Sequence, residues 1–365
     1  MKLTKLNYEE YVEDLKRNEW KLIDLSINTH SLIVGKNATG KSRTTNVIHN
    51  LAILINDSSK ILDGKWDLEF RMKNEKVFTY FLVIKDQKVI TEKITIDKET
   101  KLNRVGNETI IIANNSNSKT IHPPNDKLVL HIRRDEIEYP FFEELYNWSE
   151  NTIAYRFDRL EAGTLILGEN NNSKSLPALD LAPDTFDKLN KETALNVKED
   201  FISIGYDIEK ITTDALKGFP INAKILNITE KGIQFPLSQL ELSRGMYTAF
   251  ALLVNLHFFI QEKANQDITL IIDDLGANLD YERALKLAEV LFKKHAQRNL
   301  QIIATSNDRF LINAVDLKYL NILKRENNIV SSFNYLNSKD VFEKFELTGF
   351  NNFDLFTSDF ITKYK

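Results

Sequence analysis

A glycine-rich segment near the start of the chain has the composition of a phosphate-binding loop. Residues 35–42 read Gly-Lys-Asn-Ala-Thr-Gly-Lys-Ser, which fits the pattern GxxxxGKS. Glycine allows positive φ angles, so that successive backbone N–H groups can turn toward one anion. Lys41 would place a positive charge on the β- and γ-phosphates, and the Ser42 hydroxyl would ligate Mg²⁺. We expect the nucleotide to be held by Gly35, Lys36, Asn37, Ala38, Thr39, Gly40, Lys41, Ser42 and Arg43.

Two acidic residues follow a strongly apolar segment farther along the chain. Residues 269–272 read Thr-Leu-Ile-Ile, which predicts a buried strand, and Asp273 and Asp274 come directly after it. Ligands of open α/β sheets bind at the carboxyl ends of strands. We expect Asp273 to hold Mg²⁺, directly or through water, and Asp274 to orient or deprotonate the attacking water. Acidic residues also end strands for solubility alone, and the preceding loop is what favours the catalytic interpretation.

Two further segments precede predicted helices. Ser243, in the sequence Leu-Ser-Arg-Gly of residues 242–245, can cap the apolar helix that follows, and a capped helix end can bind an anion. Gly245 would let that backbone approach a phosphate closely. Asp280 can cap the helix that begins at Tyr281, and we assign it an additional role at a catalytic interface.

The elements that must position these residues follow from periodicity. Residues 20–25 and 31–34 have the composition of short strands, and the second runs directly into the loop. A helix follows the loop, with its apolar face made by Val47, Ile48, Leu51, Ala52 and Ile55. A strand, a glycine-rich loop and a helix in this order are the context that a phosphate-binding loop requires.

The rest of the chain predicts an α/β fold in three parts. Residues 1–130 form a lobe with the loop and an antiparallel sheet, because apolar residues alternate from residue 66 to about 112. Residues 131–222 are expected to form a helical insertion, a short arm. Residues 223–365 form a lobe in which strands and helices alternate, as in a parallel sheet with covered faces.

Finer features are predicted within these parts. In the insertion, one helix starts at Pro140, and another runs from Asp184, as its N-cap, to about Phe201. Residues 113–119 and 168–175 are Asn- and Ser-rich and should be loops. The Phe-rich residues 333–365 should dock onto the core.

Composition bounds the class of protein. The 365 residues carry a formal net charge of -4, so no global field draws the chain to DNA or anionic lipid. There are no cysteines, which excludes disulfides and Cys-ligated zinc, and the six histidines show no metal-ligand spacing. The longest apolar run, residues 249–260, is shorter than the ~20 residues that span a bilayer. With no signal peptide at the start, we expect a cytoplasmic protein.

Taken together, these motifs resemble the ABC ATPase superfamily. The order is phosphate-binding loop, LSxG signature (Leu242, Ser243, Arg244 and Gly245), two acids after an apolar strand, and a D-loop (residues 277–280). Within the superfamily the chain looks like the soluble SMC, RecF and OLD-type branch, which includes stand-alone ATPases of bacterial defence systems. The resemblance implies ATP and Mg²⁺ as cofactors and a head-to-tail homodimer. In that dimer, ATP on the loop of one subunit is closed by Ser243, Arg244 and Gly245 of the other.

Two departures from the family pattern imply slow hydrolysis of ATP to ADP and phosphate. Most relatives have Glu where this chain has Asp274, and Asn307, or alternatively Ser306, stands where a switch histidine is usual. Neither Asn nor Ser can hold a proton near neutral pH as His can. We therefore expect Asp274, Lys41 and Asn307 to be the catalytic residues, and ATP to act chiefly as an adhesive between subunits.

Four functions are compatible with these residues. The favoured one is an ATP-gated dimer that handles DNA or controls a partner effector, such as a nuclease or toxin, in phage defence or DNA repair. A transporter's ATPase subunit, a P-loop kinase or GTPase, and a non-hydrolysing ATP-dependent scaffold are the alternatives. If the chain contacts nucleic acid, the basic residues that we expect to do so are Arg133, Arg134, Lys293, Lys294 and Arg298. Given the acidic net charge, a solvated charged face is the simpler explanation of these five.

Overall fold

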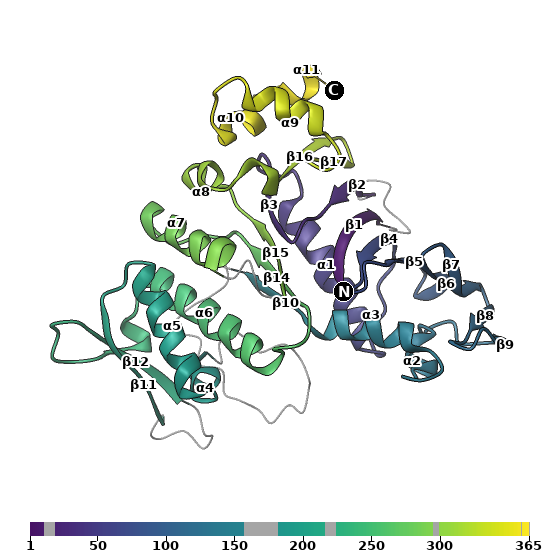
Figure 1. Cartoon of the computed structure of the whole chain (residues 1–365), viewed down its shortest axis with the longest axis horizontal. Coiled ribbons are helices and arrows are strands. Elements are labelled where there is room, and N and C mark those ends of the chain that lie inside the picture. Colours follow the sequence, from purple (N-terminus) through teal and green to yellow (C-terminus); the bar gives the residue numbers. More distant parts are fainter. Residues whose placement is uncertain (11–18, 157–181, 216–223, 295–298, 359, 365) are drawn as a thin grey trace.

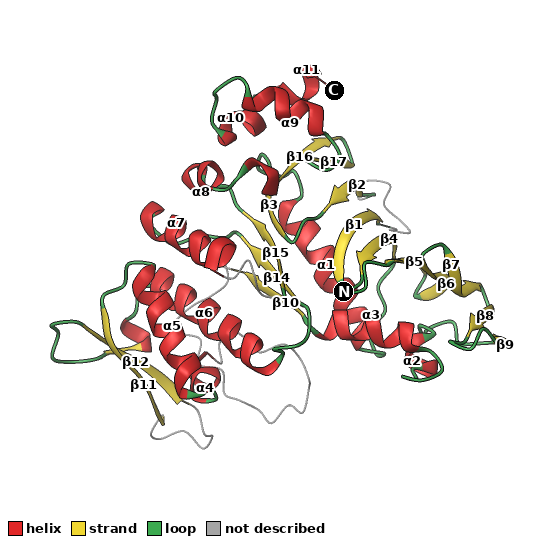
Figure 2. Ribbon diagram, viewed as in Figure 1, coloured by secondary structure: helices red, strands yellow, loops and turns green. Residues whose placement is uncertain are grey.

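The computed structural model describes residues 1–10, 19–156, 182–215, 224–294, 299–358 and 360–364. Within these residues, one 14-stranded sheet runs through the molecule, and a second, 3-stranded sheet packs against two helices that separate it from the large sheet (Figure 1). Figure 2 shows how helices and strands are distributed over the chain. The large sheet has a parallel part, which carries the candidate site, and a mainly antiparallel part.

Five neighbouring strands make up the parallel part. In order across the sheet they are β10 (Thr152–Arg156), β14 (Ile268–Asp273), β15 (Leu300–Thr305), β3 (His30–Val34) and β16 (Leu320–Glu326). Every residue of β3, β14 and β15 is buried. Strands that are apolar throughout are typical of parallel sheets, because both faces are covered. The predicted parallel sheet is confirmed.

Alternate residues of these strands point into two different hydrophobic cores. Ile271 of β14 and Ile303 of β15 lie in the core beneath α1 (Lys41–Asn56) and α3 (Pro140–Glu150). Leu270 and Ile272 lie in the core formed with α6 (Arg244–Glu262) and α7 (Tyr281–Glu289). Because side chains alternate along a strand with a period of two, α1 and α6 pack on opposite faces of the sheet (Figure 1).

The core on the α6 side also holds the end of the chain. Phe342, Phe345, Leu355 and Phe356 are buried there, so the predicted docking of the Phe-rich C-terminal segment is confirmed. The helices that complete this core are α4 (Ala182–Asp187), α5 (Lys191–Ser203), α8 (Arg309–Ala314), α9 (Lys339–Glu346), α10 (Asn352–Thr357) and α11 (Phe360–Tyr364).

The other part of the large sheet continues from β16. The next strand in the sheet is β17 (Ile329–Asn334). From β2 onward, each strand is antiparallel to the strand that follows it across the sheet. In order these are β2 (Lys21–Ser26), β1 (Lys2–Glu9), β4 (Gly64–Arg71), β5 (Val77–Lys85), β6 (Lys88–Ile96), β7 (Glu99–Val105), β8 (Glu108–Ile112) and β9 (Ser118–Ile121). In β5, burial alternates strictly from Phe78 to Ile84, as expected of a sheet with one covered face. The predicted antiparallel sheet is confirmed.

The remaining elements are short or lie in the small sheet. That sheet contains β11 (Ile208–Ala215), β12 (Lys224–Glu230) and β13 (Leu237–Ser238). The others are α2 (Leu130–Arg133), the 3₁₀ turns η3 (Gln239–Glu241) and η5 (Leu317–Tyr319), and the π-helical turn η4 (Val290–Lys294). Within the described residues, no helix is both long enough and apolar enough to cross a membrane.

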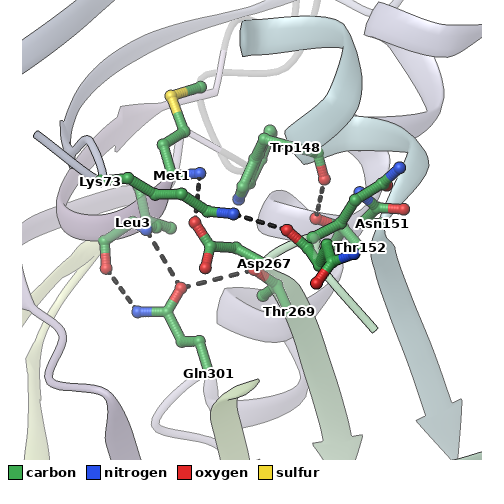
Figure 3. Close-up of polar contacts among 11 residues, drawn as sticks. Met1, Leu3, Lys73, Trp148, Asn151, Thr152, Asp267, Thr269 and Gln301 are labelled. Carbon is green, nitrogen blue, oxygen red and sulfur yellow. Dashed lines mark hydrogen bonds and ion pairs between the residues drawn. The ribbon is translucent and has the colours of Figure 1, made fainter. Parts of the chain in front are cut away.

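A polar network closes the amino ends of the parallel strands, at the edge opposite the candidate site (Figure 3). The Gln301 side chain of β15 donates to the Leu3 carbonyl at 2.7 Å and accepts from the Leu3 N–H at 3.0 Å. The amino group of Met1 pairs with the Asp267 carboxylate at 2.8 Å. These contacts attach β1 to strands that lie far away in sequence.

The structure corrects two expectations for the middle of the chain. The single helix expected from Asp184 to Phe201 is two helices, because Asn190 caps α5 by accepting from the Thr193 N–H. Asp184 lies inside α4 and is not an N-cap. Residues 131–222 also contribute β10 and β11, so this part is not purely helical. The three-part division itself stays a prediction, and the predicted loop at residues 168–175 lies outside the described residues.

A buried histidine at the start of β3 makes stability sensitive to acid. His30 is 3 % exposed and packs against the rings of Phe292 and Tyr319. Burial, with a smaller contribution from the charge of Lys2, lowers the pKa of His30 to about 4. In the unfolded chain this group is protonated near pH ~6.5. The contribution of neutral His30 to the unfolding free energy is therefore fully present above that pH and is lost as the pH falls toward the folded-state pKa.

Acidification from about pH 7.5 to 5.5 should therefore cost about 1 kcal/mol of unfolding free energy through His30 alone. The variant His30→Phe should show a pH dependence that is shallower by this amount in urea unfolding at the two pH values. Comparing slopes removes the packing cost of the substitution. The exposed His122, changed to Gln, is the matched control and should leave the slope unchanged. Equal slopes for the parent and His30→Phe would refute this assignment.

Candidate nucleotide-binding site

The loop between β3 and α1 requires glycine at both ends, for different reasons. Gly40 has φ 103°, and a Cβ there would also lie 3.0 Å from the buried Trp20 ring. A Cβ on Gly35 would lie 2.7 Å from the Thr39 hydroxyl oxygen and 2.9 Å from the Leu323 carbonyl oxygen. Within the loop, Ala38 also has a positive φ, 63°. This loop wraps tightly around the N-terminus of α1, as phosphate binding requires.

Lys41 spans this loop. Its ammonium donates to the Gly35 carbonyl at 2.9 Å, and the residue is buried. Burial lowers the pKa of Lys41, and the nearby carboxylates of Asp274 and Asp273 oppose that shift. The predicted lysine and the predicted acids are therefore brought to one place. Ser42, in the first turn of α1, is exposed.

The two acids are fixed by a threonine that the sequence analysis did not identify. The Thr305 hydroxyl, at the end of β15, donates to Asp273 Oδ1 at 2.7 Å and accepts from the Asp274 N–H at 2.8 Å. Asp273 is buried, whereas Asp274 is partly exposed and has φ 61°. A left-handed φ at a residue other than glycine is uncommon and concentrates at functional sites. The only signal in the sequence was a hydroxyl residue at the end of the neighbouring strand.

The residues after Thr305 distinguish between the two candidates for the histidine position. The Ser306 hydroxyl is buried, donates to the Leu275 carbonyl at 3.0 Å and accepts from the Asp308 N–H at 3.1 Å. Asn307 is exposed. Of the two, Asn307 is the one whose side chain is available to a ligand.

The signature segment and the D-loop contact each other within one chain. Ser243 caps α6 by accepting from the Met246 N–H at 3.2 Å, and both Ser243 and Arg244 are exposed. Gly245 is buried, and a Cβ there would lie 2.3 Å from the Asn278 carbonyl oxygen. Glycine at this position is thus required by the D-loop of the same chain, a constraint that the phosphate-approach hypothesis had not included.

The predicted caps are confirmed at both helices. Besides Ser243 at α6, Asp280 caps α7 by accepting from the Arg283 N–H at 3.0 Å, and it also pairs with the Arg283 guanidinium. The capping hydrogen bond alone explains why an aspartate precedes α7. A role of Asp280 at an interface stays a prediction. The helix that Ser243 caps, α6, and the helix whose first turn contains Ser42, α1, lie on opposite faces of the sheet.

Other side chains reach the loop. Arg325, at the end of β16, donates to the Ala38 carbonyl at 3.0 Å. Arg43 forms an ion pair with Glu10 and lies 4.9 Å from the centre of the Trp20 ring. Arg325 was not predicted, because its approach depends on a contact between segments 287 residues apart.

The basic residues proposed for nucleic acid are mostly paired within the chain. Arg134 pairs with Glu143 and stacks on the Tyr146 ring, Lys293 pairs with Glu289, and Lys294 pairs with the buried Asp200. Arg133 is exposed, and Arg298 lies outside the described residues. These pairs favour the interpretation as a solvated charged face.

Comparison with known proteins supports the family resemblance. The family model described as "AAA domain, putative AbiEii toxin, Type IV TA system" matches residues 31–313, which include the loop, the signature segment and both acids. No curated protein sequence matches the chain.

Among solved structures, the chain is similar to the SmcHead bound to the C-winged helix domain of ScpA. The sequence identity is 11%, and the TM-score is 0.54 over 91% of this chain and 97% of that chain. The SMC head domain from Thermotoga maritima gives 14% identity and a TM-score of 0.48 over 92% of this chain and 99% of that chain. At such identities the likeness shows the fold alone. The predicted α/β P-loop fold of the ABC-ATPase head type is confirmed.

Proposed function

The chain belongs to this AAA-domain family, whose model covers most of its length, and on this premise we propose that it binds ATP with Mg²⁺ at residues 35–42 and hydrolyses it slowly. The observation that carries the proposal is that α1, which begins at Lys41, packs against β14, the strand that ends at Asp273 and is followed by Asp274. A buried ammonium, a glycine loop and two carboxylates at the end of one strand of a parallel sheet are the parts that phosphoryl transfer requires.

These residues fit a bound nucleotide with its metal ion. Ser42 is exposed at the N-terminus of α1, and the Asp273 carboxylate keeps one oxygen beyond that held by Thr305. The serine hydroxyl and this carboxylate would hold Mg²⁺, which when bound neutralises phosphate charge. The Lys41 ammonium would leave the Gly35 carbonyl for phosphate oxygens. The Asp274 carboxylate would orient the attacking water and accept its proton.

We further propose that two copies close the sites head to tail. Ser243 and Arg244 are exposed at the N-terminus of α6, on the face of the sheet opposite α1. Such a helix end attracts phosphate, but one chain cannot readily turn it toward its own loop across the sheet. A second copy can, and each copy then supplies one loop and one capped helix.

Slow turnover is expected from the two side chains that would act on the attacking water. Asp274 is one methylene shorter than Glu, and Asn307 carries no titratable group. These two features also favour the second candidate function, an ATP-dependent scaffold that does not hydrolyse. In either case nucleotide would mainly set the association state.

The role that we propose for this association is control of a partner effector, such as a nuclease or toxin, or handling of DNA, in phage defence or DNA repair. The family description, which refers to a toxin–antitoxin system, supports an effector. The solved SmcHead is bound to a winged helix domain of ScpA, which supports a protein partner for a head of this fold. The internally paired basic residues make a protein partner the better supported choice.

The dimer is tested with two substitutions at one position. Asp and Asn cap helices as well as Ser does, so Ser243→Asp and Ser243→Asn should both preserve α6. With ATP and Mg²⁺, the parent should elute as a dimer in size-exclusion chromatography with light scattering. Ser243→Asn should retain much of this dimer, whereas the carboxylate of Ser243→Asp should repel phosphate and leave a monomer that still binds ATP. A dimer of Ser243→Asp as stable as that of the parent would exclude closure by this residue. Gly245→Asp is a poorer probe, because it would collide with Asn278 in the same chain.

A further inference from the structure

A third strand ends beside the two acids and carries a cation. Arg156 is the last residue of β10 and is the register partner of Asp273 in the parallel pairing of β10 with β14. Neighbouring strands lie about 4.8 Å apart, so the backbones of these two residues are adjacent at the carboxyl edge of the sheet. The sequence analysis did not single out Arg156.

The side chain of Arg156 points to the face on which α1 lies. Ala154, two residues earlier, packs against the core beneath α1, as do Ile271 and Ile303 on the next two strands. With a period of two, Arg156, Asp273 and Thr305 share that face. The Arg156 guanidinium in fact donates to the Asn46 side-chain oxygen of α1.

Asn46 places the guanidinium near the start of α1. Residues four apart lie on the same side of a helix, so Asn46 and Ser42 are neighbours one turn apart. His49, three residues farther, responds to the same cation, because burial and then the charge of Arg156 lower its pKa. Arg156 therefore lies in the space bounded by Ser42 and Asp273, where a Mg²⁺ ion and the terminal phosphate would be.

We propose that Arg156 contacts the γ-phosphate of ATP and makes the site discriminate ATP from ADP. A guanidinium cannot ligate a metal ion, but its planar fork of N–H donors matches two phosphate oxygens. Its partner in the structure, Asn46, is a neutral amide, which it can exchange for a charged acceptor. This inference rests on the proposed ATP site and adds a residue that recognises the terminal phosphate.

The test measures binding of two nucleotides by calorimetry with Mg²⁺. Arg156→Gln should bind the β,γ-imido analogue of ATP about 10-fold more weakly than the parent does, with ADP affinity unchanged, because one charge-assisted contact is lost. Arg156→Lys, which keeps the charge but loses the fork, should fall between. Asn46→Ala removes the partner in the free protein and should keep the discrimination, and Arg133→Gln controls for loss of a surface charge.

The outcomes separate this inference from the proposed function. Equal losses for both nucleotides, or a lower melting temperature with unchanged discrimination, would make Arg156 a structural link between β10 and α1 and would overturn the inference while the ATP site stands. If the parent binds neither nucleotide, both the inference and the proposed function are refuted.

Discussion

Replacing Lys41 by alanine is expected to weaken ATP binding at least ~100-fold, because a charge-assisted contact to phosphate in a partly desolvated loop is lost. In the structure this ammonium donates to the Gly35 carbonyl and lies near the carboxylates of Asp273 and Asp274. Phosphate would take over that role as counter-charge and acceptor. Titration calorimetry with ATP and Mg²⁺ measures the effect.

The control for Lys41→Ala is Lys60→Ala, which removes an exposed lysine beyond the end of α1. It should leave ATP affinity unchanged. Circular dichroism and the melting temperature of each variant test whether the fold is retained. Unchanged ATP affinity in folded Lys41→Ala would place nucleotide binding elsewhere.

Changing Asp274 to asparagine is expected to lower ATP turnover at least ~100-fold while leaving ATP affinity nearly unchanged, since general-base catalysis contributes a factor of about 10²–10⁴. Asparagine is the substitution of choice, because residue 274 has φ 61° and asparagine tolerates this conformation far better than alanine does. The backbone N–H that donates to Thr305 is retained. Phosphate release under saturating ATP measures turnover.

The conservative variant Asp274→Glu makes the assignment sharper. It restores a carboxylate with a longer reach and should keep measurable turnover, whereas Asp274→Asn should not. Turnover equal to that of the parent in Asp274→Asn would exclude Asp274 as the base. Absence of turnover in the parent itself would favour the scaffold alternative.

Local patterns were sufficient to predict the loop, the caps of α6 and α7 and the two acids, but the cap predicted at Asp184 was wrong. The spacing of Gly35, Gly40 and Lys41 is contiguous in sequence, and so is the run that ends at Asp273. Helix capping by Ser243 also depends on residues within one turn. Such features are set by backbone conformation over a few residues, and the structure confirms their geometry.

Features that depend on distant pairing could not be predicted in this way. The strand β1 is held by Gln301, and Thr305 is aligned with Asp273 only because β14 and β15 are neighbours in the sheet. Arg156 reaches the candidate site for the same reason. The period of a strand tells which face a residue takes, but not which strand will lie next to it.

Gly245 illustrates how tertiary contact changes the meaning of a motif. From sequence it was interpreted as allowing close approach of a phosphate, and the structure adds that Asn278 of the D-loop already occupies the space of a side chain. The signature helix and the D-loop are therefore coupled in each chain.

The most direct test of the central claim is complementation between two inactive variants. Lys41→Ala has a defective loop and an intact signature serine, and Ser243→Asp has the reverse. If ATP is closed between two copies, an equimolar mixture should recover up to about half of the parental ATPase activity, since neither variant closes a dimer with itself and each mixed dimer has one intact site of two. If the mixture is no more active than its separate components, while the parent is active, the site is not shared between copies and the account is wrong.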